Sequence, residues 1–194
     1  DGTGLNPSLQ NYWMVIHPPT LFLGFAACTI PAAYAIASLW VKDFTGWIKP
    51  VLPWSLFAMM ILGTGILLGG AWAYEALSFG GFWAWDPVEN ASLVPWLILV
   101  AGIHTLMAYK HTGYSLHATY TFFILCFIMV LYSSFLTKSG VLGEASVHSF
   151  TDLGMSGQLV VIILAFLLPS AYLIIDRTVK KQIPGKQTEE DLTS

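Results

Sequence analysis

The sequence predicts an all-α integral membrane protein, a bundle of about five transmembrane helices. Apolar residues make up 56% of the 194 residues and charged residues 10%, against roughly 25% charged residues in an ordinary soluble domain. The charges are also unevenly spread, because 8 of the 19 lie within residues 176–194. Most of the chain is therefore expected to have lipid rather than water around it.

Five apolar windows are each long enough for a spanning helix, which needs about 20 residues. None of them contains Asp, Glu, Lys or Arg, and they cover residues 14–41, 51–72, 91–109, 119–136 and 155–175. Their apolar runs lack two-residue alternation, which favours helices over a β-barrel. The pair Gly65 and Gly69 in the second window is typical of close helix packing.

The lysine and arginine count predicts a bundle with its N-terminus outside and its C-terminus in the cytoplasm. In this orientation the inner side carries seven basic residues and the outer side carries Lys138 alone, which follows the positive-inside rule. The segment before residue 14 and the loops 73–90 and 137–154 then face the extracytoplasmic side. Residues 1–181 are expected to form the membrane core, and the polar residues 182–194 a disordered cytoplasmic tail.

Several classes of protein are disfavoured by the composition. A net charge of −3, with no basic run before the C-terminal end, gives no footprint for nucleic acid. Cys28 and Cys126 lie in apolar windows without metal-ligand spacing, so we expect core residues rather than a disulfide framework or a zinc site. The chain opens with Asp1 and shows no signal-peptide pattern, so we expect a processed chain or part of a longer one.

The outer loop 73–90 is rich in aromatic residues, with six of them between Trp72 and Trp85, and it contains the pair Gly80 and Gly81. One interpretation is an aromatic belt at the membrane surface, which Trp and Tyr favour in many membrane proteins. The other is a flat apolar platform for a planar ligand. The platform is favoured because glycines let a backbone approach a ligand closely, which a belt does not need.

The acidic residues of this loop have a structural explanation. Asp86, Pro87 and Glu89 match a helix start, with Asp86 as N-cap, Pro87 in the first position and Glu89 reaching back from the third. Capping is therefore the favoured role of Asp86, ahead of acid or base catalysis. Glu75 lies just past the second window, and its role stays open.

Three of the five histidines are candidates for ligand binding. A single histidine is more often a satisfied polar residue, but His17 and His148 flank the aromatic loop on one membrane face. Two imidazoles beside an apolar surface are what a haem requires. His104 lies about 25 Å along the third helix, inside the bilayer, where an ionisable side chain is a functional candidate by default. His111 and His117 bracket an inner loop and are expected to be solvated.

These residues resemble the haem lyases of cytochrome c maturation, of the CcmF/NrfE type. The loop at residues 79–92, FGGFWAWDPVENAS, is similar to the tryptophan-rich "WWD" signature of that family. Further family patterns occur in family order at residues 5–10, 17–19, 139–142 and 146–150. Phe79 and Phe82 stand where tryptophans are common. The family also has more helices than five, so the resemblance implies either a fragment or a split-gene member.

The resemblance implies two haem sites. At the outer face, His17 and His148 would ligate haem on a surface that includes Trp72, Trp83, Trp85, Asp86, Gly80 and Gly81. Within the membrane, His104 would hold a separate b-type haem, with its second ligand from outside this chain.

The function implied by the resemblance is that of the haem-handling core of a cytochrome c haem lyase. Such a protein positions the haem vinyl groups for thioether formation with the CxxCH thiols of apocytochrome c. The expected partners are a haem carrier of the CcmE type and a thiol-handling chaperone of the CcmH type. The expected location is a bacterial inner membrane, or the mitochondrial inner membrane for a split organellar form. The alternatives are a transporter or channel subunit and a purely structural membrane subunit.

Overall fold

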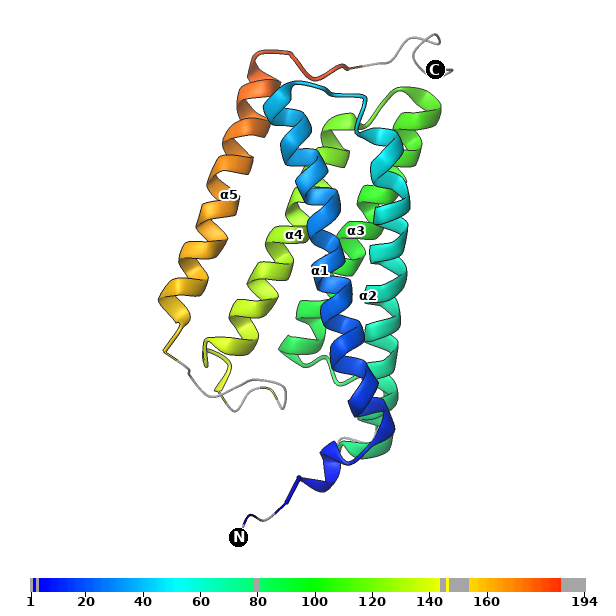
Figure 1. Ribbon diagram of the computed structural model, residues 1–194, viewed down its shortest axis with the longest axis vertical. Coiled ribbons are helices and arrows are strands. Elements are labelled where there is room, and N and C mark those ends of the chain that lie inside the picture. The colour runs from blue at the N-terminus through cyan, green and yellow to red at the C-terminus, as the bar shows by residue number, and fades with distance from the viewer. Residues whose placement is uncertain (1, 3, 79–80, 144–145, 147–153, 186–194) are drawn as a thin grey trace.

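The computed structural model describes all residues except 1, 3, 79–80, 144–145, 147–153 and 186–194. The described chain is all helical. It contains a short 3-10 turn and five long helices, η1 (Pro7–Leu9), α1 (Tyr12–Val41), α2 (Ile48–Ala76), α3 (Pro87–Thr112), α4 (Leu116–Lys138) and α5 (Ser156–Val179). Successive helices run up and down, so the N-terminal segment and the end of α5 lie at opposite ends of the bundle (Figure 1).

The five predicted apolar windows are confirmed, since each coincides with one helix long and apolar enough to cross a membrane, with Met155 as the N-cap of α5. The helices extend past the windows because their caps lie in the polar flanks. Asn11 caps α1 by accepting a hydrogen bond from the Trp13 N–H at 2.8 Å. α3 ends at Gly113, whose φ of 74° is the left-handed conformation that closes many helices.

α1 and α2 pack with very close backbones, which glycine makes possible. A Cβ added to Gly24 would lie 2.5 Å from the Cα of Leu62, and one added to Gly65 would lie 2.7 Å from the Cα of Leu21. Helices in a membrane associate through such small-residue contacts, because burial from lipid supplies little driving force. The packing role predicted for Gly65 is confirmed.

The end of the bundle that holds the α1–α2 turn is fixed by aromatic and polar contacts. Trp47 stacks on Tyr120 with ring centroids 4.8 Å apart, and the Tyr120 hydroxyl lies 2.9 Å from that of Ser38. The Arg177 Nε–H donates to the carbonyl of Leu39 at 3.0 Å, which joins α5 to the end of α1. Cys28 and Cys126 are both buried, as predicted for core residues.

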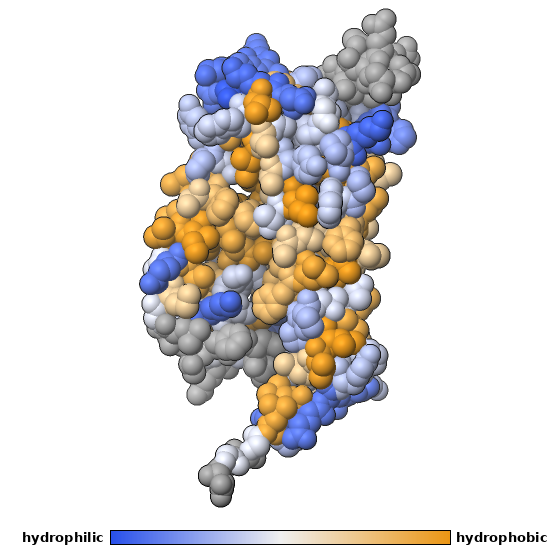
Figure 2. Space-filling view, viewed as in Figure 1, coloured by the Kyte–Doolittle hydropathy of each residue, from blue (hydrophilic) through white to orange (hydrophobic). Residues whose placement is uncertain are grey.

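The outer surface of the bundle is apolar around its middle. Figure 2 shows a hydrophobic band there, with hydrophilic residues gathered at the upper end. α5 shows this apolar exposure clearly. It buries only Ser170 and Leu173, and it exposes a long series of large apolar residues such as Val161, Leu168 and Ile175. A surface of this kind suits hydrocarbon rather than water.

Candidate functional site

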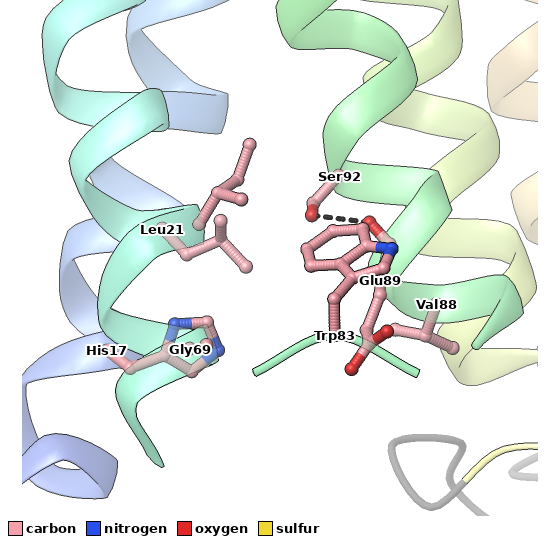
Figure 3. Close-up of a pocket in the computed structure, with 9 residues that line it drawn as sticks. His17, Leu21, Gly69, Trp83, Val88, Glu89 and Ser92 are labelled. Carbon is pink, nitrogen blue, oxygen red and sulfur yellow. Dashed lines mark hydrogen bonds between the residues drawn. The ribbon is translucent and has the colours of Figure 1, made fainter. Parts of the chain in front are cut away.

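A pocket opens at the N-terminal end of the bundle, between the α1–α2 pair and the first turn of α3. It contains about 380 Å³ of space, including its open side, and is lined by His17, Leu21, Ile66, Gly69, Gly70, Trp83, Val88, Glu89 and Ser92. Figure 3 shows His17 and Trp83 on opposite sides of this space.

His17 forms the α1 wall of the pocket and is held by α2. Its Nδ1 lies 2.8 Å from the carbonyl oxygen of Gly65. A carbonyl can only accept, so Nδ1 must carry the proton, and the lone pair of the neutral ring is then at Nε2. The sequence predicted His17 at this end of the bundle, and the structure adds that Nδ1 is the nitrogen bonded to α2.

Trp72 supports His17 from α2. The two rings are nearly parallel, with an interplanar angle of 21° and centroids 6.2 Å apart. Trp72 is only 6% exposed, and its indole N–H donates to the carbonyl of Ser8 at 2.8 Å, which ties η1 to α2. Trp72 therefore contacts the proposed ligand residue and the N-terminal segment, rather than offering an open face.

Trp83 and Trp85 take different positions within the aromatic loop. Trp83 lines the pocket, and its buried Nε1–H has no hydrogen-bond partner in the described part of the chain. Trp85 is 72% exposed and has a φ of 57°, which bulky residues rarely adopt. The two rings meet edge to face at 86° with centroids 6.3 Å apart. They form two differently directed faces, not one flat surface.

The loop backbone is fastened to the first turn of α3. Glu89 Oε2 accepts the N–H groups of Ala84 at 3.0 Å and Asp86 at 3.2 Å. The Asn90 side chain donates to the carbonyl of Trp85 at 3.1 Å. Asp86 accepts the Val88 N–H at 3.2 Å, which completes the predicted capping box. The same carboxylates that start α3 therefore set the shape of the loop around Trp85.

Asp86 has a second contact that the capping pattern did not predict. The hydroxyl of Ser146 donates to its Oδ2 at 2.7 Å, so the aromatic loop is bonded to the segment between α4 and α5. Two predicted site residues, His148 and Gly80, lie outside the described residues. Gly81 is described, and a Cβ there would meet only ordinary contacts, at 3.8 Å from the Trp83 carbonyl oxygen.

Gly69 and Gly70 of α2 allow close approach at the pocket, whereas Gly81, the described glycine of the loop pair, makes only ordinary contacts. A Cβ on Gly69 would lie 2.6 Å from His17 Cε1, and one on Gly70 would lie 2.1 Å from Cε1 of the Phe82 ring. The sequence pattern predicted only a packing role for Gly69. The contact between Gly69 and His17 could be predicted from their positions. The two residues lie at similar distances before and after the turn that joins two antiparallel helices, so they lie at a similar height in the bundle.

Glu75 acquires a structural partner. Its Oε2 accepts a hydrogen bond from the Asn11 side chain at 3.1 Å, and Asn11 also caps α1. Glu75 thus fixes the start of α1 to the end of α2. No sequence signal links these two positions, which are 64 residues apart.

The remaining histidines lie away from the pocket. His104 is exposed on α3, and its Nδ1 lies 2.8 Å from the Val100 carbonyl oxygen, which again leaves the lone pair at Nε2. His111 and His117 flank the turn between α3 and α4, at the opposite end of the bundle from the pocket. His111 is exposed and His117 is half-buried.

Sequence comparison identifies the family of this bundle. A family model described as "Cytochrome C assembly protein" matches residues 1–142, which include η1, the pocket and four of the long helices. The chain belongs to the cytochrome c assembly protein family. The resemblance to CcmF/NrfE proteins is thereby confirmed, since the chain is 43% identical over 169 residues to the cytochrome c-type biogenesis protein CcmF of Pseudomonas aeruginosa.

Other relatives agree. The CcmF protein of Escherichia coli is 37% identical over 175 residues, and the NrfE protein of Haemophilus influenzae is 36% identical over 173. A solved structure titled "Cytochrome c Heme Lyase CcmF" superposes with a TM-score of 0.72 at 31% identity, covering 86% of this chain and 26% of that one. The match covers 87% of this chain and 25% of the Pseudomonas protein, so the chain spans about a quarter of the relatives' length. The five apolar helices and the similarity to CcmF proteins identify the chain as an integral membrane protein of the haem lyase family.

Proposed function

We propose that this chain is the haem-handling core of a cytochrome c haem lyase, with its site on the extracytoplasmic side of the membrane. The observation that carries the proposal is the placement of His17. Its ring is held by Gly65 so that the lone pair is at Nε2, and it lines a pocket opposite Trp83. An imidazole of this tautomer beside an aromatic wall suits an axial ligand of haem iron.

Other residues at this pocket offer groups that a haem, here the substrate, would contact. Leu21, Ile66 and Val88 supply apolar walls. The buried Nε1–H of Trp83 needs an acceptor, because a buried donor without one costs about 1–3 kcal/mol. A haem propionate is a carboxylate and would be a suitable acceptor. His148 is proposed as the second iron ligand, by the family resemblance.

The role of the chain in the reaction is to position the reactants. In thioether formation each thiol of a CxxCH segment adds across a vinyl group, so that a C–S bond forms and the thiol proton passes to the other vinyl carbon. The thiols belong to apocytochrome c, since Cys28 and Cys126 are both buried among the helices. Holding a vinyl beside a thiol lowers the barrier through effective concentration. Delivery by a CcmE-type carrier and a CcmH-type chaperone completes the proposed cycle.

His104 is proposed to hold a b-type haem within the membrane. An exposed imidazole among apolar neighbours such as Leu97 and Met107 is unfavourable in lipid unless something covers it. Its Nε2 lone pair suits an iron ligand, and the second ligand would come from outside this chain. Such a haem supplies electron transfer, which would keep the iron at the outer site reduced.

The membrane orientation is proposed from charge. Lys42 and Lys110 lie at the end of the bundle away from the pocket, together with Arg177 and Lys180. The positive-inside rule then places the pocket outside, in a bacterial inner membrane or in its mitochondrial counterpart.

The test is a titration of the 194-residue chain with iron protoporphyrin IX in lipid nanodiscs, followed by visible absorption. Wild type should give the sharpened spectrum of imidazole-ligated haem, and His17→Ala should lose the contribution of the outer site. His104→Ala should retain that contribution and lose any signal from the membrane site. A wild-type chain that leaves the haem spectrum as in empty nanodiscs would contradict the proposal and favour a transporter or structural subunit.

A further inference from the structure

The contact between His17 and two glycines of α2 is more specific than helix packing requires. His17 Nδ1 lies 2.8 Å from the Gly65 carbonyl oxygen. One turn further along α2, a Cβ on Gly69 would lie 2.6 Å from His17 Cε1, 2.9 Å from Nδ1 and 3.2 Å from Nε2. The imidazole therefore occupies the space that any other residue at position 69 would fill.

The absence of a side chain at Gly69 also explains why the Gly65 carbonyl can be reached. In an α-helix each Cα–Cβ bond tilts toward the N-terminus, so a side chain covers the turn that precedes it. A side chain at position 69 would thus cover the carbonyl of residue 65. With glycine there, that carbonyl can accept from His17 as well as taking part in the helix.

We propose that the Gly65 carbonyl and the open position at Gly69 form a seat that fixes His17 as the Nδ1–H tautomer and presents Nε2 to the haem iron. Gly65 and Gly69 are positioning residues, and the haem in this statement rests on the proposed function. A hydrogen-bond acceptor on the non-ligating nitrogen sets the tautomer and orientation of a metal-binding histidine. Trp72, stacked on the ring, fixes its plane.

The seat can be tested without haem. ¹⁵N-histidine NMR of the haem-free chain in nanodiscs distinguishes Nδ1–H from Nε2–H tautomers, and the His17 signals are assigned by their loss in His17→Gln. We expect the Nδ1–H form in wild type, although free neutral histidine prefers Nε2–H. An Nε2–H tautomer at His17 in wild type would overturn the seat. This measurement needs no glycine variant, so it holds even where such a variant fails to fold.

Gly69→Ala tests the open position. The new methyl group should displace the ring and remove the Nδ1–H signature. The matched control is Gly63→Ala on the same helix, whose Cβ would meet Trp96 Nε1 at 2.8 Å rather than His17. An unchanged His17 tautomer in folded Gly69→Ala would overturn the role of that glycine.

Haem binding separates the seat from the proposed function. Gly69→Ala should raise the Kd for iron protoporphyrin IX at least about tenfold, the usual effect of losing a hydrogen bond that orients a metal ligand. Gly63→Ala should leave the Kd near the wild-type value. Equal Kd values for folded Gly69→Ala and wild type would overturn the seat as a positioning device. If the tautomer is as expected but His17→Ala binds haem normally, the seat stands as structure and the proposed ligand role of His17 fails.

Discussion

The hydroxyl of Ser146 donates a hydrogen bond to Oδ2 of Asp86 at 2.7 Å, across 60 residues of sequence. Asp86 thereby joins three parts of the pocket end of the bundle, because it also caps α3 and follows the aromatic loop directly. His148, the second proposed ligand, is two residues from Ser146 in the chain. This bond connects the two loops on which the proposed haem site depends.

We predict a graded loss of stability when this bond and the cap are removed. Ser146→Ala should cost about 1.5 kcal/mol in free energy of unfolding, the lower value for a hydrogen bond to a charged group. Asp86→Ala should cost about 1 kcal/mol more, because the cap is lost too. Asp86→Asn should be the mildest, since asparagine caps well and its amide can donate to the Ser146 hydroxyl oxygen. Unfolding by SDS titration in mixed micelles measures all three.

The control for this series is Ser78→Ala, an exposed serine at the same end of the bundle. It should change stability by less than about 0.5 kcal/mol. If Asp86→Asn proves as damaging as Asp86→Ala, the negative charge itself has a role that neither capping nor the Ser146 bond explains.

The histidines should separate into two groups by their effect on cytochrome c assembly. His17→Ala and His148→Ala are each expected to abolish assembly in a complementation assay, because both are proposed to ligate the outer haem. His111→Ala and His117→Ala should support normal assembly, since they flank the turn at the opposite end. Normal cytochrome c levels in the His17→Ala, His148→Ala double variant would remove the ligand assignment.

Trp83→Phe should lower haem affinity without lowering stability. The phenyl ring keeps most of the apolar wall but removes a buried N–H that has no partner in the described residues. The free energy of unfolding should therefore stay level or rise by up to about 1 kcal/mol, while haem affinity falls. Thermal unfolding and haem titration on the same samples measure both. A clear loss of stability with unchanged affinity would show that the indole N–H serves the fold.

Replacing both Trp83 and Trp85 with leucine separates a haem surface from an interfacial belt. Leucine keeps apolar area but not a rigid aromatic face. We expect normal insertion and helix content by circular dichroism, with loss of outer-site haem and of cytochrome assembly. If the double variant retains haem at this site, the aromatic loop is an interfacial belt and not a haem surface.

Cysteine labelling with a membrane-impermeant maleimide tests the orientation. Cysteines at Ser78 and Ser149 should react from outside in intact cells, and one at Tyr114 should react only after lysis. Tyr114 is a better site than its neighbour Gly113, which is buried and has a φ of 74°. Wild type serves as the blank, because both native cysteines are 1% exposed. The reverse labelling pattern would put the pocket in the cytoplasm.

The sequence predicted the features that depend on local pattern. Long apolar runs determine the helices because backbone groups in hydrocarbon must bond within their own segment. The cap formed by Asp86 and Glu89 is also predictable, because its hydrogen-bonding partners lie within three residues of each other. The seat of His17 and the Ser146 bond depend on contacts between distant segments, which no single-sequence pattern specifies.

Trp72 lies in the same aromatic stretch as Trp83 and Trp85, and aromatic density alone predicts one role for all three residues. Its helical phase distinguishes it, because Trp72 falls seven residues after Gly65, on the same buried stripe of α2 as Leu62. The phase of the helix, and not the local density of aromatic residues, turns Trp72 inward against His17.

The backbone at Trp85 has a consequence for any attempt to make this protein more robust. A bulky residue at a φ of 57° costs roughly 1–3 kcal/mol, and here the bonds from Glu89 and Asn90 hold it in place. Glycine or asparagine at position 85 would relieve that strain, so a redesign guided by stability alone would choose one of them. Either substitution would remove the exposed indole of Trp85. Under the proposed function, selection for stability and selection for haem binding would therefore favour different residues at position 85.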